Sequence, residues 1–112
     1  MESGKIIKGS LSAIILKLLQ NNGRMYGYEI TKAVRDGSKG KTRITEAALY
    51  PALHKLEEAG LLETESELAE GRMRKYYKLS RKGKKESVIQ LDALQEAIAS
   101  LQKILKYRLK NG

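Results

Sequence analysis

The chain has 112 residues, a length that suits one small domain, or one domain with an appended helix. Its 22 Lys and Arg against 13 Asp and Glu give a formal net charge of +9, which points to an anionic partner, either nucleic acid or an acidic membrane surface. With no cysteine and a single histidine the chain has no disulfide framework and no cluster of metal ligands, so we expect a cytoplasmic protein with no metal and no cofactor.

The first predicted helix covers about residues 10–21, with Ser10 as its N-cap. Its apolar residues follow the i, i+3, i+4, i+7, i+8 spacing of an amphipathic helix: Leu11, Ile14, Ile15, Leu18 and Leu19. Lys17 interrupts this stretch, and its unbroken apolar run is far shorter than the roughly 20 residues of a membrane span. We expect a soluble helix rather than a signal peptide, and we assign Leu11 and Ile15 to a dimer contact.

A second helix is predicted over about residues 26–36, followed by a glycine- and lysine-rich loop. The third helix begins at Glu46 with Thr45 as its N-cap, and Gly60 suits the left-handed residue after its end. One side of this helix is a leucine stripe, Leu49, Leu53 and Leu56. The other side is small and weakly charged: Ala47, Tyr50, Pro51, His54 and Glu58. A mild outer face beside a basic segment is typical of a helix that enters a DNA groove.

Pro51 lies within this third helix and has no N–H to donate to the carbonyl of Ala47. Deep inside a helix this costs roughly 3 kcal/mol. Either the regular helix starts near Leu49, with Pro51 in its first turn, or it starts at Glu46 and bends at Pro51. Both versions leave residues 46–50 as an N-terminal turn that projects outward.

Two strands follow, over residues 61–68 and 72–79, and form a hairpin that turns at residues 69–71. Ser80 then caps a helix that reaches about Leu109, a length of roughly 45 Å. Its apolar residues step by three and four positions, as in a heptad seam: Leu91, Leu94, Ile98, Leu101 and Leu105. So small a domain offers no partner for a helix of this length, so the seam predicts packing against a second copy of the chain.

The predicted fold is therefore mainly α with a β-hairpin wing. It consists of a winged helix-turn-helix over residues 1–80 and a long C-terminal dimerisation helix over residues 81–112. The charge is unevenly spread along it. Residues 46–70 carry one basic and seven acidic side chains, whereas residues 71–85 carry eight basic and no acidic ones. The positive charge thus flanks the third helix rather than lying on it.

Three segments resemble the PadR family of bacterial transcriptional regulators, over roughly residues 8–85. They are Gly27-Tyr-Glu-Ile30, the run from Ala48 to Leu62 that contains Leu-Tyr-Pro-Ala-Leu, and Arg74-Lys-Tyr-Tyr-Lys-Leu-Ser-Arg-Lys-Gly83. The single helix after the wing is similar to that of the small subgroup. The resemblance implies a homodimeric repressor that binds double-stranded DNA and is released by an effector or stress signal. A symmetric dimer should recognise a near-palindromic operator.

The third helix is predicted to supply the base contacts. Ala47 suits a thymine methyl, Glu46 suits a cytosine amino group, and Thr45 suits a phosphate or a base. Tyr50 and His54 would reach phosphate or base edges, and Lys55 is the only basic residue of this helix. The alternative for each is structural: Thr45 only caps the helix, Tyr50 packs on the domain, and His54 is a solvated surface residue. Tyr28, at the start of the second helix, binds a phosphate or packs on the core.

Phosphate binding is assigned to the loop before the third helix and to the wing. The loop cations are Lys39, Lys41 and Arg43, and the wing cations are Arg72, Arg74, Lys75 and Lys78. The alternative is a cross-strand ladder in which Glu63, Glu65 and Glu67 pair with the basic residues of the return strand. Such exposed pairs are worth roughly 0.2–1 kcal/mol each. Arg72 is nearest the tip and least involved in such a ladder.

Two alternatives to this interpretation stay open. The last helix could lie on an acidic membrane instead of forming a dimer, although it is only mildly basic. The domain could bind a protein instead of DNA. Some small members of the resembled family take flat aromatic drugs between tryptophans, but this chain has no Trp or Phe, and Tyr107 is the only aromatic residue of the last helix. No catalytic constellation is present, so we do not expect an enzyme.

Overall fold

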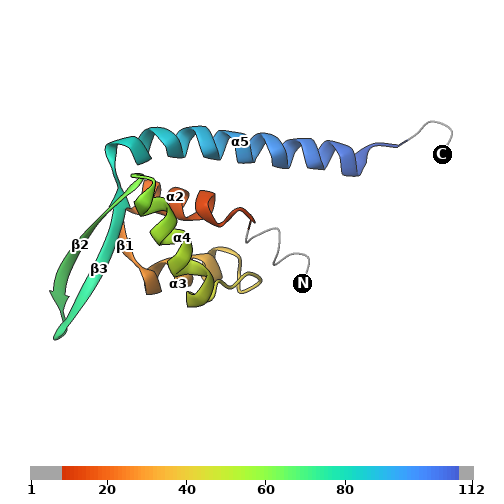
Figure 1. The fold of residues 1–112 in the computed structure, drawn as a ribbon. Helices are drawn as coiled ribbons and strands as arrows, with labels where there is room; N and C mark the ends of the chain where they lie inside the picture. The colour runs from red at the N-terminus through yellow and green to blue at the C-terminus, as the bar shows by residue number, and fades with distance from the viewer. Residues whose placement is uncertain (1–8, 109–112) are drawn as a thin grey trace.

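The computed structural model describes residues 9–108 and confirms the predicted fold class (Figure 1). In chain order its elements are α2 (Leu11–Asn22), β1 (Arg24–Tyr26), α3 (Gly27–Gly37), α4 (Glu46–Glu58), β2 (Leu62–Ala69), β3 (Arg72–Leu79) and α5 (Arg81–Lys106). Helices α2, α3 and α4 form the body, the β2–β3 hairpin projects from it, and α5 runs along α2 and beyond it (Figure 1). The arrangement is a winged helix followed by a long helical arm.

The core lies between the three helices and the root of the sheet. The leucine stripe of α4 is buried as predicted: Leu49 and Leu53 are fully buried and Leu56 is 5% exposed. The assignment of Leu11 and Ile15 to a dimer contact is wrong, because both belong to this core, with exposures of 5% and 0%. Because both side chains are buried within one copy of the chain, almost none of their surface is left for a second copy to contact.

Strand β1 was not predicted from the sequence. It pairs antiparallel with β3, from Arg24 opposite Lys78 to Tyr26 opposite Tyr76, and gives the sheet the order β1-β3-β2. The hairpin itself closes on a two-residue turn, Glu70-Gly71, in which both residues have positive φ (53° and 77°). This is the backbone of a type I′ turn, whose twist matches that of the flanking strands and which fixes the register of the wing.

Helix α4 runs without interruption from Glu46 through Pro51 to Glu58. The version in which regular helix starts only near Leu49 is therefore wrong. Thr45 is the N-cap, and its Oγ1 accepts a hydrogen bond from the Ala48 N–H at 3.2 Å. Gly60 ends the helix with φ of +79°, as predicted, and the Leu61 N–H returns to the Leu56 carbonyl at 3.0 Å. By contrast, Ser10 precedes α2 but makes no side-chain cap hydrogen bond.

The start of α5 is fastened to the end of α4. Ser80 is the N-cap: its Oγ accepts from the Gly83 N–H at 2.9 Å and donates to the Gly60 carbonyl at 2.6 Å. The Ser80 N–H donates to the Leu61 carbonyl at 2.9 Å. Gly83 is buried so closely against this carbonyl group that a Cβ would stand 2.9 Å from the Leu61 carbonyl carbon and overlap its oxygen. The arm therefore leaves the body at a direction set by backbone contacts.

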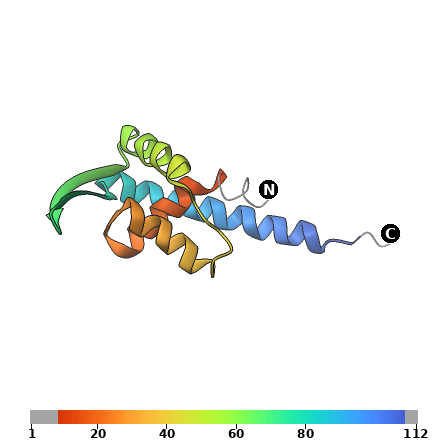
Figure 2. The same ribbon diagram turned by 90° about the horizontal axis from the view of Figure 1, so that it is seen from below.

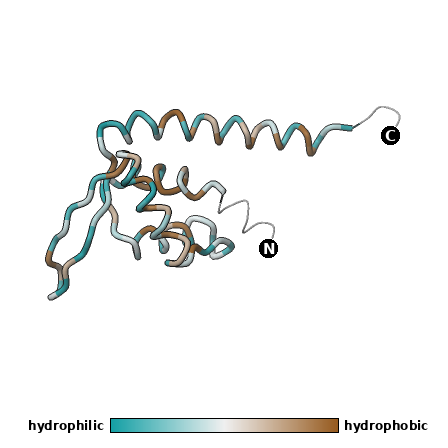
Figure 3. Tube along the Cα trace, in the orientation of Figure 1, coloured by the Kyte–Doolittle hydropathy of each residue, from teal (hydrophilic) through white to brown (hydrophobic). Residues whose placement is uncertain are grey.

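The far half of α5 lies beyond the body, which gives the molecule extents of 66 × 29 × 21 Å (Figures 1 and 2). The helix ends at Lys106, earlier than the predicted end at Leu109, which lies outside the described residues. Ser87 is fully buried against α2, where its Oγ accepts a hydrogen bond from Gln20 at 3.4 Å. Further along, exposure rises to 83% at Leu105. The hydrophobic positions of the arm stay uncovered toward its end (Figure 3).

Candidate nucleic-acid interface

The outer face of α4 is exposed over its whole length. The predicted contact residues Glu46, Ala47, His54 and Lys55 all lie on it, and Thr45 stands at its N-terminus. The Thr45 hydroxyl serves as the cap, so the structural alternative holds for its acceptor oxygen, while its proton remains able to donate. None of these side chains is drawn into the core, and together they form a continuous surface on one helix.

Tyr50 lies further along the same helix than Ala47 and is 37% exposed. Its hydroxyl rests against Gly27 at the start of α3, where a Cβ would overlap Oη and stand 2.9 Å from Cζ. Tyr50 thus packs on the domain, as the structural alternative proposed, and Gly27 is the residue that makes room for it. Tyr28, the next residue of α3, is 58% exposed and so is free of the core.

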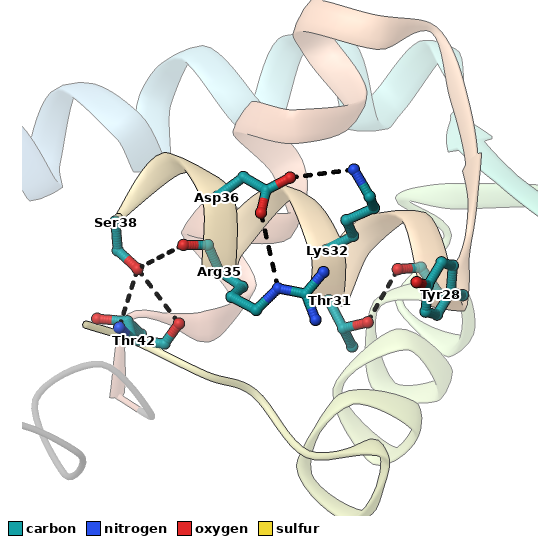
Figure 4. Close-up of polar contacts among 7 residues, drawn as sticks. All are labelled: Tyr28, Thr31, Lys32, Arg35, Asp36, Ser38 and Thr42. Atoms are coloured by element: carbon teal, nitrogen blue, oxygen red, sulfur yellow. Dashed lines mark hydrogen bonds and ion pairs between the residues drawn. The ribbon is translucent and has the colours of Figure 1, made fainter. Parts of the chain in front are cut away.

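The loop between α3 and α4 is organised by Ser38 (Figure 4). Its Oγ accepts from the Thr42 N–H at 2.9 Å and lies 3.2 Å from both the Arg35 and Thr42 carbonyl oxygens, so its proton can donate to one of them. The three loop cations, Lys39, Lys41 and Arg43, are exposed around this closed turn.

Next to the loop, Asp36 joins Lys32 at 3.1 Å and Arg35 at 3.6 Å (Figure 4). The hydrogen bond from Lys32 lowers the pKa of Asp36 below its usual value. Lys32 and Arg35 lie four and seven residues after Tyr28, hence on the same face of α3. This stripe was not singled out in the sequence, because the two cations look like an ordinary solvated helix face.

On the wing, the register places the strand carboxylates on the same face as Arg74 and Lys78, here called the outer face of the wing. Glu63 is opposite Lys78, Glu65 is opposite Tyr76, and Glu67 is opposite Arg74. The ladder alternative is therefore realised in part: Lys78 pairs with Glu65 at 3.6 Å, and Arg74 pairs with Glu70 of the turn at 3.6 Å.

Arg24 of β1 is the main partner of the wing carboxylates, and sequence reasoning missed it. Its guanidinium donates to Glu65 at 2.8 Å and to Glu67, and lies 4.0 Å from the centroid of the Tyr76 ring. The hydrogen bond with Glu65 raises the pKa of Arg24, and the same bond lowers the pKa of Glu65. Arg24 thus links β1 to the β2–β3 hairpin on the outer face of the wing.

Arg74 also makes its contacts on the outer face of the wing. It lies 4.6 Å from the centroid of the Tyr26 ring, and the neighbouring Tyr76 hydroxyl is the main cause that raises the pKa of its guanidinium. Tyr26 and Tyr76 contact each other edge to face at 5.5 Å. Arg24 and Arg74 therefore stack on two touching tyrosine rings. The guanidinium of Arg74 is held in place rather than free to follow a partner.

Arg72 is different, since within residues 9–108 no carboxylate lies within ion-pair distance of it. It is exposed beside the turn, as the sequence indicated. Lys75 lies on the opposite face of β3, at 3.9 Å from Glu57 at the end of α4 and 5.4 Å from the centroid of the Tyr77 ring. Tyr77 is 2% exposed, and this burial raises the pKa of its hydroxyl.

The predicted seam of α5 divides into two parts. Leu91 and Leu94 are half-buried on the part of the helix that runs along α2. Ile98, Leu101 and Leu105 are 47%, 56% and 83% exposed on the part beyond it. Ile104 adds a further exposed apolar side chain, at 66%. An apolar row of this kind, next to a body that covers only its first part, is a candidate surface for another helix.

Residues 9–108 also bear on membrane insertion and on metal binding. No helix there is long and apolar enough to cross a membrane. The same residues contain no group of three or more His, Cys, Asp or Glu side chains placed to hold a metal ion.

Comparison with known proteins decides the family. Residues 15–88 match the family described as the transcriptional regulator PadR-like family. The chain belongs to the PadR-like family of transcriptional regulators. It is 35% identical over 85 residues to an uncharacterized protein of Lysinibacillus sphaericus, which covers 75% of this chain and 77% of that protein.

Solved structures of similar proteins agree with this. A transcriptional regulator from Clostridium thermocellum has a TM-score of 0.81 at 29% identity, covering 91% of this chain and 99% of that one. A PadR family transcriptional regulator from Eggerthella lenta has a TM-score of 0.78 at 25% identity, covering 93% of this chain and 88% of that one. Both likenesses cover nearly the whole of this chain.

In this PadR-like regulator, the candidate interface comprises the outer face of α4, the loop before it and the wing. The predicted residues of α4 and its cap, Thr45, are all exposed, although Tyr50 packs its hydroxyl against Gly27. Arg72 lies at the wing tip, whereas Arg74 lies on the outer face of the wing and Lys75 on its inner face. The contribution of Arg24 had no sequence signal, because its two carboxylate partners lie 41 and 43 residues away.

Proposed function

We propose that this PadR-like regulator is a sequence-specific DNA-binding protein that acts as a homodimeric repressor and is released by an effector. The observation that carries the proposal is the placement of α4. Its outer face is exposed from Thr45 to Lys55, and in the chain it follows the basic loop and precedes the basic wing. Helix, loop and wing supply complementary parts of a DNA-binding surface.

In this proposal the helix, the loop and the wing make different kinds of contact with DNA. Residues near the N-terminus of α4 read base edges in the major groove, where Ala47 suits a thymine methyl and Glu46 a cytosine amino group. Lys39, Lys41, Arg43 and Arg72 bind phosphates and set affinity and register. Tyr28 at the start of α3 adds a phosphate contact through its exposed hydroxyl. Tyr50 acts mainly by supporting the α3–α4 junction, since its hydroxyl packs on Gly27.

The dimer in this proposal is formed by the arm. Residues 81–112 pair with the same helix of a second copy through Ile98, Leu101, Leu105 and the neighbouring apolar positions, and residues 1–80 form the DNA-binding domain. With two-fold symmetry, two copies of α4 address half-sites about one helical turn apart, roughly 34 Å. The operator is then a near-palindrome.

The experiment that tests the proposal is binding-site selection from random duplexes with the purified protein. We expect a near-palindromic sequence with half-sites about one helical turn apart. The affinity should fall steeply as salt is raised, and Arg72→Ala should lower the magnitude of that salt slope by about one unit. His54→Ala should alter sequence preference more than affinity for random DNA. The competing function, a winged-helix module that binds protein only, predicts no salt-dependent duplex binding at all.

A further inference from the structure

The two faces of the wing differ sharply in charge. In a strand, successive side chains point to opposite faces. The register puts all three strand carboxylates, Glu63, Glu65 and Glu67, on the outer face. The opposite, inner face has no carboxylate on either strand of the hairpin: it consists of Leu62, Thr64, Ser66 and Leu68 on β2 and Met73, Lys75, Tyr77 and Leu79 on β3. The inner face thus presents only apolar, hydroxyl and cationic groups.

The tip of this inner face is apolar and exposed. Leu68 and Met73 are directly opposite each other, one residue pair from the turn, and are 67% and 66% exposed. Figure 3 shows hydrophobic colour near the end of the hairpin. Strand β1 pairs only as far as Tyr76, so the hairpin extends past it by the residues Lys75 to Arg72, roughly 13 Å. These two large apolar side chains lie near the tip of the hairpin, where the body does not cover them, in a chain whose net charge is +9.

The inner face turns toward the side of the domain that carries α4. At its root, Leu62, Tyr77 and Leu79 are buried in the core. Halfway along, Lys75 forms its ion pair with Glu57 near the end of α4. Leu68 and Met73 continue this same face outward. The apolar pair is therefore on the side where the proposed function places the duplex, whereas the self-paired outer face is turned away.

We propose that Leu68 and Met73 form an apolar wedge that enters the minor groove next to the major groove occupied by α4. This inference rests on the proposed function and specifies how the wing takes part in it. Leu and Met are among the side chains that partly unstack base steps from the minor groove. The absence of carboxylates on this face, with Lys75 behind and Arg72 beside the pair, suits a polyanion and disfavours a second copy of an equally basic chain.

A wedge of this kind distinguishes DNA sequences by how easily their base steps unstack. Pyrimidine–purine steps are the easiest to unstack, so the wing should favour TA or CA steps just outside each half-site, without hydrogen bonds to those bases. Arg72 then anchors the tip to a phosphate, and specificity at the flank comes from the two apolar side chains.

The test compares the wild type with the double variant Leu68→Thr/Met73→Thr, which keeps strand propensity and removes the apolar pair. Ser66→Thr, one inner-face position nearer the core, is the matched control. Each protein is used in binding-site selection from random duplexes, and affinity is then measured on the selected wild-type operator and on random DNA. We expect the double variant to lose about ten-fold or more on the operator, and to lose the flanking-step preference while keeping that of the half-site core. Ser66→Thr should behave as the wild type.

The outcomes distinguish a failure of this inference from a failure of the proposed DNA-binding function. If the wild type shows no salt-dependent duplex binding, the proposed function fails. If the wild type selects an operator and the double variant binds it equally well with the same flanking preference, the wedge is refuted and the function stands. An equal loss on operator and random DNA, with the flanking preference unchanged, also refutes it. So does a change in oligomeric state by sedimentation with unaltered DNA binding, which would assign the pair to a protein contact.

Discussion

Gly83→Ala should destabilise the protein, although it replaces a glycine within a helix. In an exposed helix interior, Gly→Ala stabilises by up to about 1 kcal/mol, because alanine loses less backbone entropy on folding. Gly83 is buried in the first turn of α5, and a Cβ there would overlap the Leu61 carbonyl oxygen and stand 2.9 Å from its carbon. Carbon atoms are ordinarily at least about 3.5 Å apart, so α5 or the chain at Leu61 must move by at least about 0.6 Å.

That movement has to break the contacts that join α4 to α5. The Leu61 carbonyl accepts from the Ser80 N–H at 2.9 Å, and Ser80 Oγ bonds to both the Gly60 carbonyl and the Gly83 N–H. Each such hydrogen bond is worth about 0.5–1.5 kcal/mol net, so losing two or three costs about 1–4 kcal/mol. After the gain in helix propensity is deducted, we expect a net loss of about 1–3 kcal/mol and a fall in Tm of roughly 5–10 °C.

The assay is thermal and urea unfolding at one fixed protein concentration, since oligomerisation makes Tm depend on concentration. Gly37→Ala is the matched control: Gly37 ends α3, has no positive φ, and a Cβ there would meet nothing within 4 Å. It should leave the stability unchanged or raise it by a few tenths of a kcal/mol. The reasoning is refuted if Gly83→Ala is as stable as Gly37→Ala.

Three further predictions concern the core, the α3–α4 junction and the wing. Leu53→Ala removes a fully buried side chain and should cost about 2–5 kcal/mol in urea unfolding; a loss below 1 kcal/mol would contradict the burial of the α4 stripe. Gly27→Ala should lower Tm by forcing the Tyr50 ring away, and adding Tyr50→Phe should restore part of the loss; strict additivity of the two changes would show that they do not touch. Arg24→Gln should return the pKa of Glu65 toward its ordinary value of about 4.3, as followed by NMR titration of the carboxyl group. Because the folded-state pKa of Glu65 is lowered, the pairing stabilises the protein above the unfolded-state value, and this stability is lost as the pH falls through the folded-state value. Wild type and variant should therefore converge in stability once the pH lies below the folded-state value, and a constant difference would argue against the pairing.

The elements with strong periodicity could be predicted from the sequence. The leucine stripe of α4, its Thr45 cap and the glycine that ends it are local signals, and each stands where the pattern indicated. The hairpin was also predictable, because Glu70-Gly71 is flanked by two runs rich in strand-forming residues. In these segments the local preference and the tertiary environment agree, so a reading of neighbouring residues is enough.

The remainder depended on contacts between residues distant in sequence. Three residues of β1 are too few for an alternating pattern, and they form a strand only because β3 offers them its free edge. Periodicity identified Leu11 and Ile15 as apolar-face residues, but it does not say whether that face meets the protein's own core or a second copy; the body covers them first. Whether the acids and bases of the wing share a face depended on a register that only the turn geometry decides.

The wing also shows why a count of basic residues overstates what is free to bind phosphate. Arg24 and Lys78 are taken up by Glu65 and Glu67, and Arg74 is stacked on Tyr26. These pairs are exposed and individually weak, yet they gather the strand carboxylates on the outer face and hold the hairpin against β1. What is left for a polyanion is the tip, with Arg72, since Lys75 on the inner face lies 3.9 Å from Glu57. Charge neutralisation on the outer face therefore makes the two faces of the wing different. In the proposed complex with DNA, the uncharged pair at the tip, rather than the arginines behind it, is the part of the wing that distinguishes one sequence from another.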